Sequence, residues 1–336
     1  MSRRYKGGVT SATAPVPTGP YQCGTANGIW TLPQQMQSTA AGIWPTQGNA
    51  YGTVAIFAIG YSTSSATLTT TRNKYTFSGC TSAVATAATA GACRQSAAGN
   101  DTRGIFALGN TAGASTTRNK YTYSGDVNAA AAAASVASCS GSATGNATAG
   151  IFALGQTLTT RNKYTYSGCT SAVATASSLG TCAGSAAGNS TVGIFALGND
   201  PSIPSTTRNK YTYSGCTSAA ATAASVATFG GAAAGTSTVG IFALGANCCC
   251  GPNPLTTRNK YTYSGDVNAA ATAASFASRG GSAAGNATVG IFALGNNVTT
   301  RQKYTYSGCT SAAATASSAN SFAGAAASNG TTGVNV

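Results

Sequence analysis

The sequence lacks the residues on which most enzyme chemistry depends. It contains no histidine and no glutamate, and its only acids are four aspartates. General acid–base catalysis relies on histidine or on paired carboxylates with tuned pKa values, and catalytic metal sites need clustered ligands. We therefore expect a protein that binds rather than catalyses, with no metal or other cofactor. Two of the aspartates, Asp126 and Asp266, recur at equivalent positions, where we expect them to shape turns.

Long apolar segments are also missing. No run of apolar residues approaches the ~18 needed to cross a bilayer, so we expect no membrane insertion. The N-terminus is basic, but no hydrophobic stretch follows it, and a signal peptide is not expected. These two features predict synthesis in the cytoplasm.

Negative charge is scarce, and positive charge is not. Eighteen lysines and arginines give a formal net charge of +14. Such a balance favours anionic partners such as phosphate-rich glycan or lipid surfaces, nucleic acid or an acidic neighbouring subunit. The alternative is that the charge serves solubility alone.

The eleven cysteines do not form an obvious disulfide framework, because their number is odd. Cys80, Cys169, Cys216 and Cys309 occupy one equivalent position in four repeats, too far apart to be bridged. We interpret them as buried or half-buried thiols. The run Cys248–Cys250 has no histidine and no CxxC partner, so it is a weak metal candidate.

Two short elements repeat along the chain. Ile-Phe-Ala-Leu-Gly ends at Gly109, Gly155, Gly198, Gly245 and Gly295, with a variant ending at Gly60. Arg-Asn-Lys-Tyr-Thr-Tyr begins at Arg118, Arg161, Arg208 and Arg258. The copy at Arg72 has Phe77 in place of the last tyrosine, and the copy at Arg301 has Gln302 in place of asparagine. From each arginine to the next glycine is always 37 positions, as from Arg72 to Gly109, whereas the return varies from 6 to 13. A rigid module is therefore joined by one connector of variable length.

Each module predicts four short strands. Small-residue segments such as 282–286 give the first, Gly-Ile-Phe-Ala-Leu the second, Lys-Tyr-Thr-Tyr-Ser the third, and alanine-rich segments such as 219–225 the fourth. Alanine also favours helix, but these runs are short and bounded by glycine. A repeat of four strands corresponds to one propeller blade. We expect glycine and alanine on the strand nearest the axis, where the blades crowd together. We expect the strand at 54–60 to borrow its inner neighbour from 323–329, which would close the ring.

The order of a small-residue strand, a strand ending in glycine and a strand bearing tyrosine resembles the kelch repeat. This sequence departs from it in having one glycine where kelch repeats have two, and in lacking the tryptophan after the tyrosine. The resemblance implies an all-β, six-bladed kelch-like β-propeller over residues 51–336. It speaks to architecture rather than activity.

Residues 1–50 differ from the repeats, and we interpret them as an N-terminal attachment arm. Their residues Gly7–Val9, Gly28–Leu32, Gln34–Gln35 and Ala41–Pro45 resemble the N-terminal region of bacteriophage tail-fibre-like virion proteins. The resemblance implies a virion structural protein attached to the particle through Trp30, Leu32 and Trp44. The alternative is an arm that folds back on the propeller.

Twelve of the basic residues belong to the repeated motif, and in a propeller they follow the variable connectors. The predicted basic ring consists of Arg72, Lys74, Arg118, Lys120, Arg161, Lys163, Arg208, Lys210, Arg258, Lys260, Arg301 and Lys303. We expect this face to contact an anionic host-surface glycan or neighbouring subunits in a homo-oligomeric assembly. The alternative for these residues is bracing of neighbouring blades. The alternative function is a capsid-decoration or filament subunit without receptor binding.

Overall fold

The computed structural model describes residues 52–62, 67–200, 203–243, 245–247 and 253–329. Within those ranges every regular element is a β-strand, and no helix long and apolar enough to span a membrane occurs there. The proposed arm, with Trp30, Leu32 and Trp44, lies outside the described residues, as do Cys248–Cys250.

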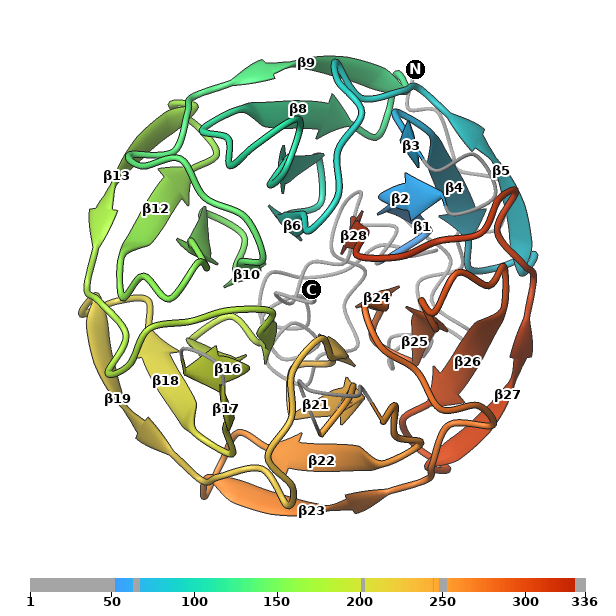
Figure 1. The fold of residues 1–336 in the computed structure, drawn as a ribbon. Helices are drawn as coiled ribbons and strands as arrows, with labels where there is room; N and C mark the ends of the chain where they lie inside the picture. The colour runs from blue at the N-terminus through green and yellow to red at the C-terminus, as the bar shows by residue number, and fades with distance from the viewer. Residues whose placement is uncertain (1–51, 63–66, 201–202, 244, 248–252, 330–336) are drawn as a thin grey trace, which may run out of the picture. The chain divides into compact units, whose positions relative to one another are not determined.

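Six four-stranded antiparallel sheets surround one axis as the blades of a propeller (Figure 1). The innermost strands are β28 (Ala325–Ser328), β6 (Ser96–Gly99), β10 (Ser142–Gly145), β14 (Ser185–Gly188), β20 (Ala232–Gly235) and β24 (Ser282–Gly285). The second strands are β1 (Val54–Ala58), β7 (Arg103–Ala107), β11 (Ala149–Ala153), β15 (Val192–Ala196), β21 (Val239–Ala243) and β25 (Val289–Ala293). The third strands are β4 (Arg72–Thr76), β8 (Arg118–Thr122), β12 (Arg161–Thr165), β18 (Arg208–Thr212), β22 (Arg258–Thr262) and β26 (Arg301–Thr305). The outermost strands are β5 (Thr81–Ala85), β9 (Val127–Ala131), β13 (Thr170–Ala174), β19 (Thr217–Ala221), β23 (Val267–Ala271) and β27 (Thr310–Ala314). The predicted six-bladed propeller is confirmed.

The ring is closed by the end of the chain. Blade 1 has the strand order β28-β1-β4-β5, so its inner strand comes from the C-terminal side. Ala55 pairs with Ser328 and Ala58 with Ala325 in an antiparallel register. Beyond the pairing, the Val54 amide donates to Asn329 Oδ1 at 2.9 Å. The predicted closure is therefore confirmed.

The third and fourth strands both lie earlier in the chain than predicted. In blade 4 the third strand is Arg208–Thr212, which begins two residues before the predicted Lys-Tyr-Thr-Tyr-Ser segment, and the fourth is Thr217–Ala221 instead of 219–225. The chain leaves the sheet there because Thr222 bonds the next blade: its amide donates to Asp266 Oδ1 at 3.0 Å. The alanine-rich segments thus form an edge strand followed by a crossing connector.

Side-chain size increases from the axis outward. The inner strands carry only Gly, Ala, Ser and Thr, and their side chains are buried. The wider space between blades is filled by one Ile and one Phe from each second strand and by tyrosines from each third strand. Each apolar cluster joins two neighbouring blades, as where Ile241 of blade 5 packs with Phe292 and Tyr304 of blade 6. A buried aromatic side chain contributes about 2–3 kcal/mol, so these contacts hold the blades together.

Three compensating differences in blade 1 show how tightly the centre is packed. In blades 2 to 6 the inner and second strands pair glycine with glycine, as Gly285 with Gly290, beneath a tyrosine hydroxyl. A Cβ atom on Gly290 would lie 2.7 Å from the Tyr306 hydroxyl, which is too close. Blade 1 has Ala55 and Ser328 in place of the two glycines, and Phe77 in place of the tyrosine. Removing the hydroxyl makes room for the larger side chains.

The turns at one end of the blades bond the next blade. Asn146, in the turn between β10 and β11, accepts from the amides of Thr148 and Ala149 and donates to the Ser190 carbonyl of blade 4 at 3.1 Å. Equivalent bonds run from Asn100 to Ala147 and from Asn189 to Ser237. The asparagines of these Asn-x-Thr segments therefore join neighbouring blades. We call this end of the ring the turn face.

We predict that Gly290→Ala lowers the free energy of unfolding by about 1–3 kcal/mol, because the new methyl group meets the Tyr306 hydroxyl. In a Tyr306→Phe background the same change should cost much less, with a coupling free energy of ~1 kcal/mol. Denaturant titration of the four variants of this cycle provides the measurement. The matched control is Gly308→Ala, where the added methyl has ordinary contacts. Equal costs of Gly290→Ala in both backgrounds would contradict the packing argument.

The buried tyrosines also predict an alkaline transition. Burial raises the pKa of Tyr164 to about 12 and holds the pKa of Tyr166 and Tyr263 well above the usual value. A hydroxyl that keeps its proton longer in the folded than in the unfolded chain contributes stability below pH ~10 that is lost as the pH rises through the folded pKa. We expect the tyrosinate absorbance of the eleven buried tyrosines, out of fifteen in the chain, to appear together with loss of β-sheet circular dichroism near pH 12. Ionisation of all fifteen near pH 10 with the β-sheet signal intact would contradict this.

Candidate functional site

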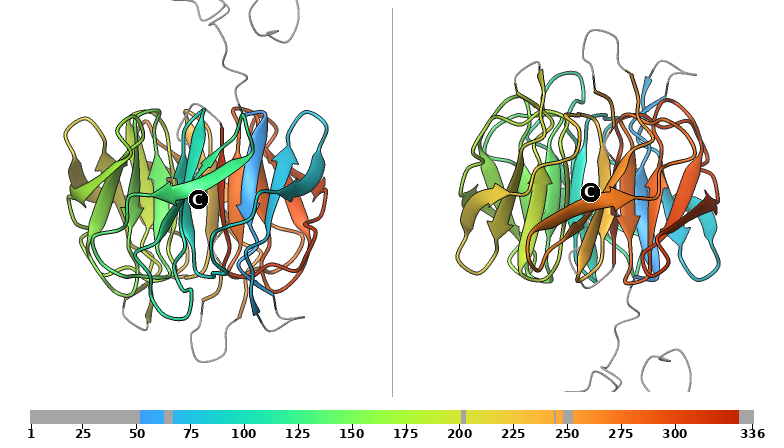
Figure 2. Two further views of the ribbon diagram at one scale, coloured as in Figure 1. Left: turned by 90° about the horizontal axis from the view of Figure 1, so that it is seen from above. Right: turned by 90° about the horizontal axis from the view of Figure 1, so that it is seen from below.

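All variation in connector length lies at one face of the ring. Because the strands of each blade are antiparallel, the connectors between second and third strands share a face with those that lead from a fourth strand to the next blade. We call this the variable-loop face; it lies opposite the turn face (Figure 2). Two of its connectors form small hairpins, β2 (Tyr61–Ser62) with β3 (Thr67–Leu68) and β16 (Asn199–Asp200) with β17 (Ile203–Pro204).

The repeated arginine braces neighbouring blades. The Arg161 guanidinium of blade 3 is buried and donates to Ser218 Oγ at 2.9 Å and Asn209 Oδ1 at 3.3 Å, both in blade 4. It also lies 4.6 Å from the centroid of the Phe195 ring, which belongs to blade 4 as well. Burial lowers the pKa of Arg161 to about 10. Hydrogen bonds and the ring face replace the hydration that this cation loses.

The same contact recurs at all six blade junctions. Each arginine donates to the Asn or Gln that follows the equivalent arginine of the next blade: Arg72 to Asn119, Arg118 to Asn162, Arg161 to Asn209, Arg208 to Asn259, Arg258 to Gln302 and Arg301 to Asn73. The last bond joins blade 6 to blade 1, so the series closes on itself.

The asparagine of the motif ties in the connector as well. Asn209 Oδ1 accepts from the Ser178 amide at 2.9 Å, and Asn209 Nδ2 donates to Ser178 Oγ at 2.8 Å. Ser178 lies in the segment that crosses from blade 3 to blade 4. One side chain therefore fixes the neighbouring arginine and the incoming chain together.

This geometry corrects the expected basic ring. All six arginines are buried at blade junctions, where the bracing alternative describes their contacts. The six lysines are half-buried. Where their contacts are defined, they face the turn of the next blade: Lys163 Nζ lies 3.6 Å from Cys216 Sγ, and Lys210 Nζ lies 3.9 Å from Asp266 Oδ2. The twelve residues do not form one exposed basic ring.

The four equivalent cysteines are half-buried, as expected, and occupy turns with φ of 48–51°. Each thiol donates to the carbonyl three residues earlier, as Cys169 to Tyr166 at 3.7 Å. Asp126 and Asp266 hold the same left-handed conformation in the other two blades, with φ of 52° and 56°. The turn-shaping interpretation of these aspartates is confirmed. In the described residues, no group of three or more Cys and Asp side chains could hold a metal ion.

The variable-loop face exposes apolar side chains. Phe276 (62 % exposed), Leu179 and Val136 project from the connectors between blades, and Ile203 (72 %) and Val298 from the connectors within blades. The flanking segments are conserved between blades, but these positions differ from one blade to the next. The side chains of this face therefore differ between blades, although the scaffold that carries them is uniform.

A ring of backbone hydrogen bonds surrounds the axis at this face. The residues two positions before each inner strand have left-handed φ values of 52–65°, and they are linked from blade to blade. The bonds are Ser140 N to Arg94 O, Ala183 N to Ser140 O, Gly230 N to Ala183 O, Gly280 N to Gly230 O and Ala323 N to Gly280 O, at 2.7–2.9 Å, with Gln95 N to Ala323 O at 3.4 Å completing the circle. We call these six residues, 94, 140, 183, 230, 280 and 323, the collar.

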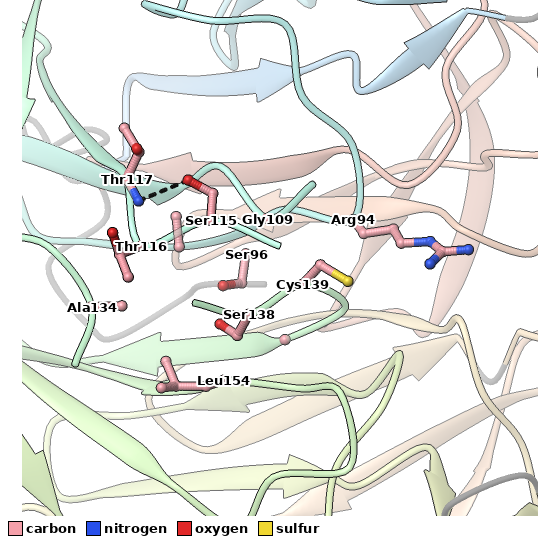
Figure 3. Close-up of a pocket in the computed structure, with 12 residues that line it drawn as sticks. Arg94, Ser96, Gly109, Ser115, Thr116, Thr117, Ala134, Ser138, Cys139 and Leu154 are labelled. Carbon is pink, nitrogen blue, oxygen red and sulfur yellow. Dashed lines mark hydrogen bonds between the residues drawn. The ribbon is translucent and has the colours of Figure 1, made fainter. Parts of the chain in front are cut away.

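The residue before each collar position varies in a way that sequence analysis did not detect. These six mouth positions are Cys93, Cys139, Cys182, Phe229, Arg279 and Phe322. A cavity of about 10 Å³ lies beside the collar between blades 2 and 3, and a second of the same size lies by Phe229. Such a volume holds about one water molecule. In Figure 3 the Arg94 guanidinium points away from the other residues of the first cavity.

Together these features define a closed six-bladed β-propeller with one uniform and one variable face. No protein-family model and no curated protein matches the sequence. Among solved structures the chain is similar to YjhT, with a TM-score of 0.55 and 10% identity over 73% of this chain and 93% of that one. It is also similar to TolB from Acinetobacter baumannii, with a TM-score of 0.54 and 10% identity over 88% and 70% of the two chains. At this identity the similarity concerns the fold alone.

We predict that Arg161→Lys lowers the free energy of unfolding by about 2–3 kcal/mol, because an ammonium group cannot reproduce the forked contacts and stays buried. Lys163→Gln, two residues away and half-buried, should change it by less than ~0.5 kcal/mol. Urea unfolding of both variants measures the difference. Equal stability of the Arg161→Lys variant and the original protein would show that the brace adds nothing.

Proposed function

We propose that this chain is a tail-fibre-like structural protein of a bacteriophage particle, which binds the host surface or neighbouring subunits through its variable-loop face. The observation that carries the proposal is the confinement of length variation to one face of a braced ring, where the connectors also expose apolar side chains that differ between blades. Recognition proteins commonly place variable loops on a rigid scaffold, because the scaffold pays little entropy on binding.

The sequence of residues 1–50 supports the particle assignment through its resemblance to virion proteins. On this proposal Trp30, Leu32 and Trp44 attach the chain to other virion subunits. The propeller would then be the outward part, present as a homo-oligomer in the assembled particle. The absence of histidine and glutamate from the sequence favours binding over catalysis as its role.

One observation favours the second candidate, a capsid-decoration or filament subunit. The six outermost strands contain no charged residue, and Val84 and Val173 are 71 % and 72 % exposed on them. Soluble proteins usually protect edge strands with charge, so uncharged edges suit contact with further copies. Under this candidate the perimeter, rather than the variable-loop face, is the contact surface.

We predict that Phe276→Asp and Leu179→Asp each weaken binding of the chain to host cells by about tenfold, because each charge would be buried in the contact. The matched control is Val173→Asp on the perimeter, which should leave binding unchanged. Cell-binding titration with fluorescently labelled protein measures the effect. The opposite pattern, with only Val173→Asp disruptive, would favour the second candidate.

Gold-labelled antibodies on native particles give an independent measurement. The proposal expects a few copies at the tail, whereas a regular lattice of label over the capsid would support decoration. Label absent from particles would overturn both assignments.

A further inference from the structure

The collar mouth is chemically divided into two halves. Blades 2, 3 and 4 present the thiols of Cys93, Cys139 and Cys182, whereas the inner strands of blades 5, 6 and 1 follow Phe229, Arg279 and Phe322. We call Phe229, Arg279 and Phe322 the aromatic half; they belong to three consecutive blades around the axis. Its members are half-buried, so part of each side chain remains accessible at the variable-loop face.

Arg279 is held in a defined position in this half. Its guanidinium lies 5.4 Å from the centroid of the Phe322 ring. Its Cγ atom lies 3.1 Å from where a Cβ of Gly230 would be, and Phe322 likewise lies 2.6 Å from the Cβ position of Gly280. Two collar glycines thus leave space for the two large side chains to lie along the ring.

The positive charge of the collar has no counter-charge among the residues that the structure describes. Arg94 is exposed at the collar itself, and Arg279 Nε is buried without an acceptor among the described residues. Within the described part of the chain, the one ion pair is Lys210 with Asp266, on the perimeter. The Nε atoms of the motif arginines also lack an acceptor, but the terminal nitrogens of each donate to amide or hydroxyl oxygens in the next blade. Among the described residues of the variable-loop face, Arg94 and Arg279 are therefore the arginines available to an external anion.

We propose that the collar mouth binds the carboxylate of an acidic sugar. The forked donors of arginine match a planar carboxylate, and the accessible part of the half-buried Phe229 and Phe322 side chains offers an apolar contact to the sugar ring. An inorganic anion would use the arginines but not the rings. This inference rests on the proposed function and names the ligand class of the variable-loop face.

The test is a chemical-shift titration of the full chain with a short uronic-acid oligosaccharide, its methyl ester, inorganic phosphate and a glutamate-rich peptide. We expect the acid form to bind with a Kd of ~1 mM, as suits a shallow site, and the methyl ester to bind at least ~10-fold more weakly. Binding of the ester as tightly as the acid, or of phosphate or the peptide as tightly as the oligosaccharide, would overturn the assignment.

Variants locate the site. Arg279→Gln and Arg94→Gln should each weaken oligosaccharide binding by about 10-fold or more, and Phe229→Ala by a smaller factor. Arg279→Lys keeps the charge but not the forked donors, so its affinity for the oligosaccharide should lie between those of the original protein and of Arg279→Gln. The matched control is Arg103→Gln, which removes the same charge at the turn face, where Arg103 donates to the Tyr166 carbonyl; it should leave affinity unchanged. Loss of affinity with Arg103→Gln equal to that with Arg279→Gln would show a non-specific charge effect.

The outcome separates this inference from the proposed function. If Phe276→Asp and Leu179→Asp abolish cell binding but no acidic sugar binds the collar, the inference fails and the binding face stands. If the sugar binds the collar but cells bind independently of these loops, the proposed contact fails and the sugar site stands.

Discussion

The structure depends on six buried arginines that each leave one blade and bond the next. A guanidinium buried without a carboxylate would ordinarily be costly, because its hydration is lost. Here amide and hydroxyl oxygens accept from its terminal nitrogens, and a phenylalanine ring lies 4.5–4.7 Å away at every junction. A desolvated contact of this kind is worth about 2 kcal/mol. Lysine could not replace arginine, since a strongly hydrated ammonium group has neither the fork nor the flat face.

Closure makes these contacts collective. The arginine bonds join blades in the outer half of the ring, the collar bonds join them around the axis at the variable-loop face, and the Asn-x-Thr turns join them at the turn face. Each blade is both donor and acceptor, so no blade is at an end. A change in blade shape would be felt at two junctions, which explains why the 37-position module keeps its length and the connectors outside these contacts do not.

Because the motif arginine is buried in every blade, few charges remain for recognition. Six of the eighteen basic residues brace the blades, and Lys163 and Lys210 face the turn of the next blade. What distinguishes the variable-loop face is its connectors of unequal length, whose exposed apolar side chains differ between blades, together with Arg94 in the collar and Arg279 at a mouth position. The high net charge is therefore a poor guide to where a ligand binds, because most of it belongs to the repeated scaffold.

The sequence by itself determined the number of blades, the order of their strands and the closure by the segment 323–329, within which the strand is Ala325–Ser328. The repeat period, the spacing of the motifs and the order of small and aromatic residues can all be read from the sequence alone. It also placed the turn role of Asp126 and Asp266. The direction of the Arg161 side chain was decided only by tertiary structure, because its partners Asn209 and Ser218 lie in another blade. The collar could not be predicted either: its residues share a backbone conformation and a hydrogen bond to the adjacent blade, but Arg94, Ser140 and Gly230 share no side-chain chemistry that a repeat pattern could reveal.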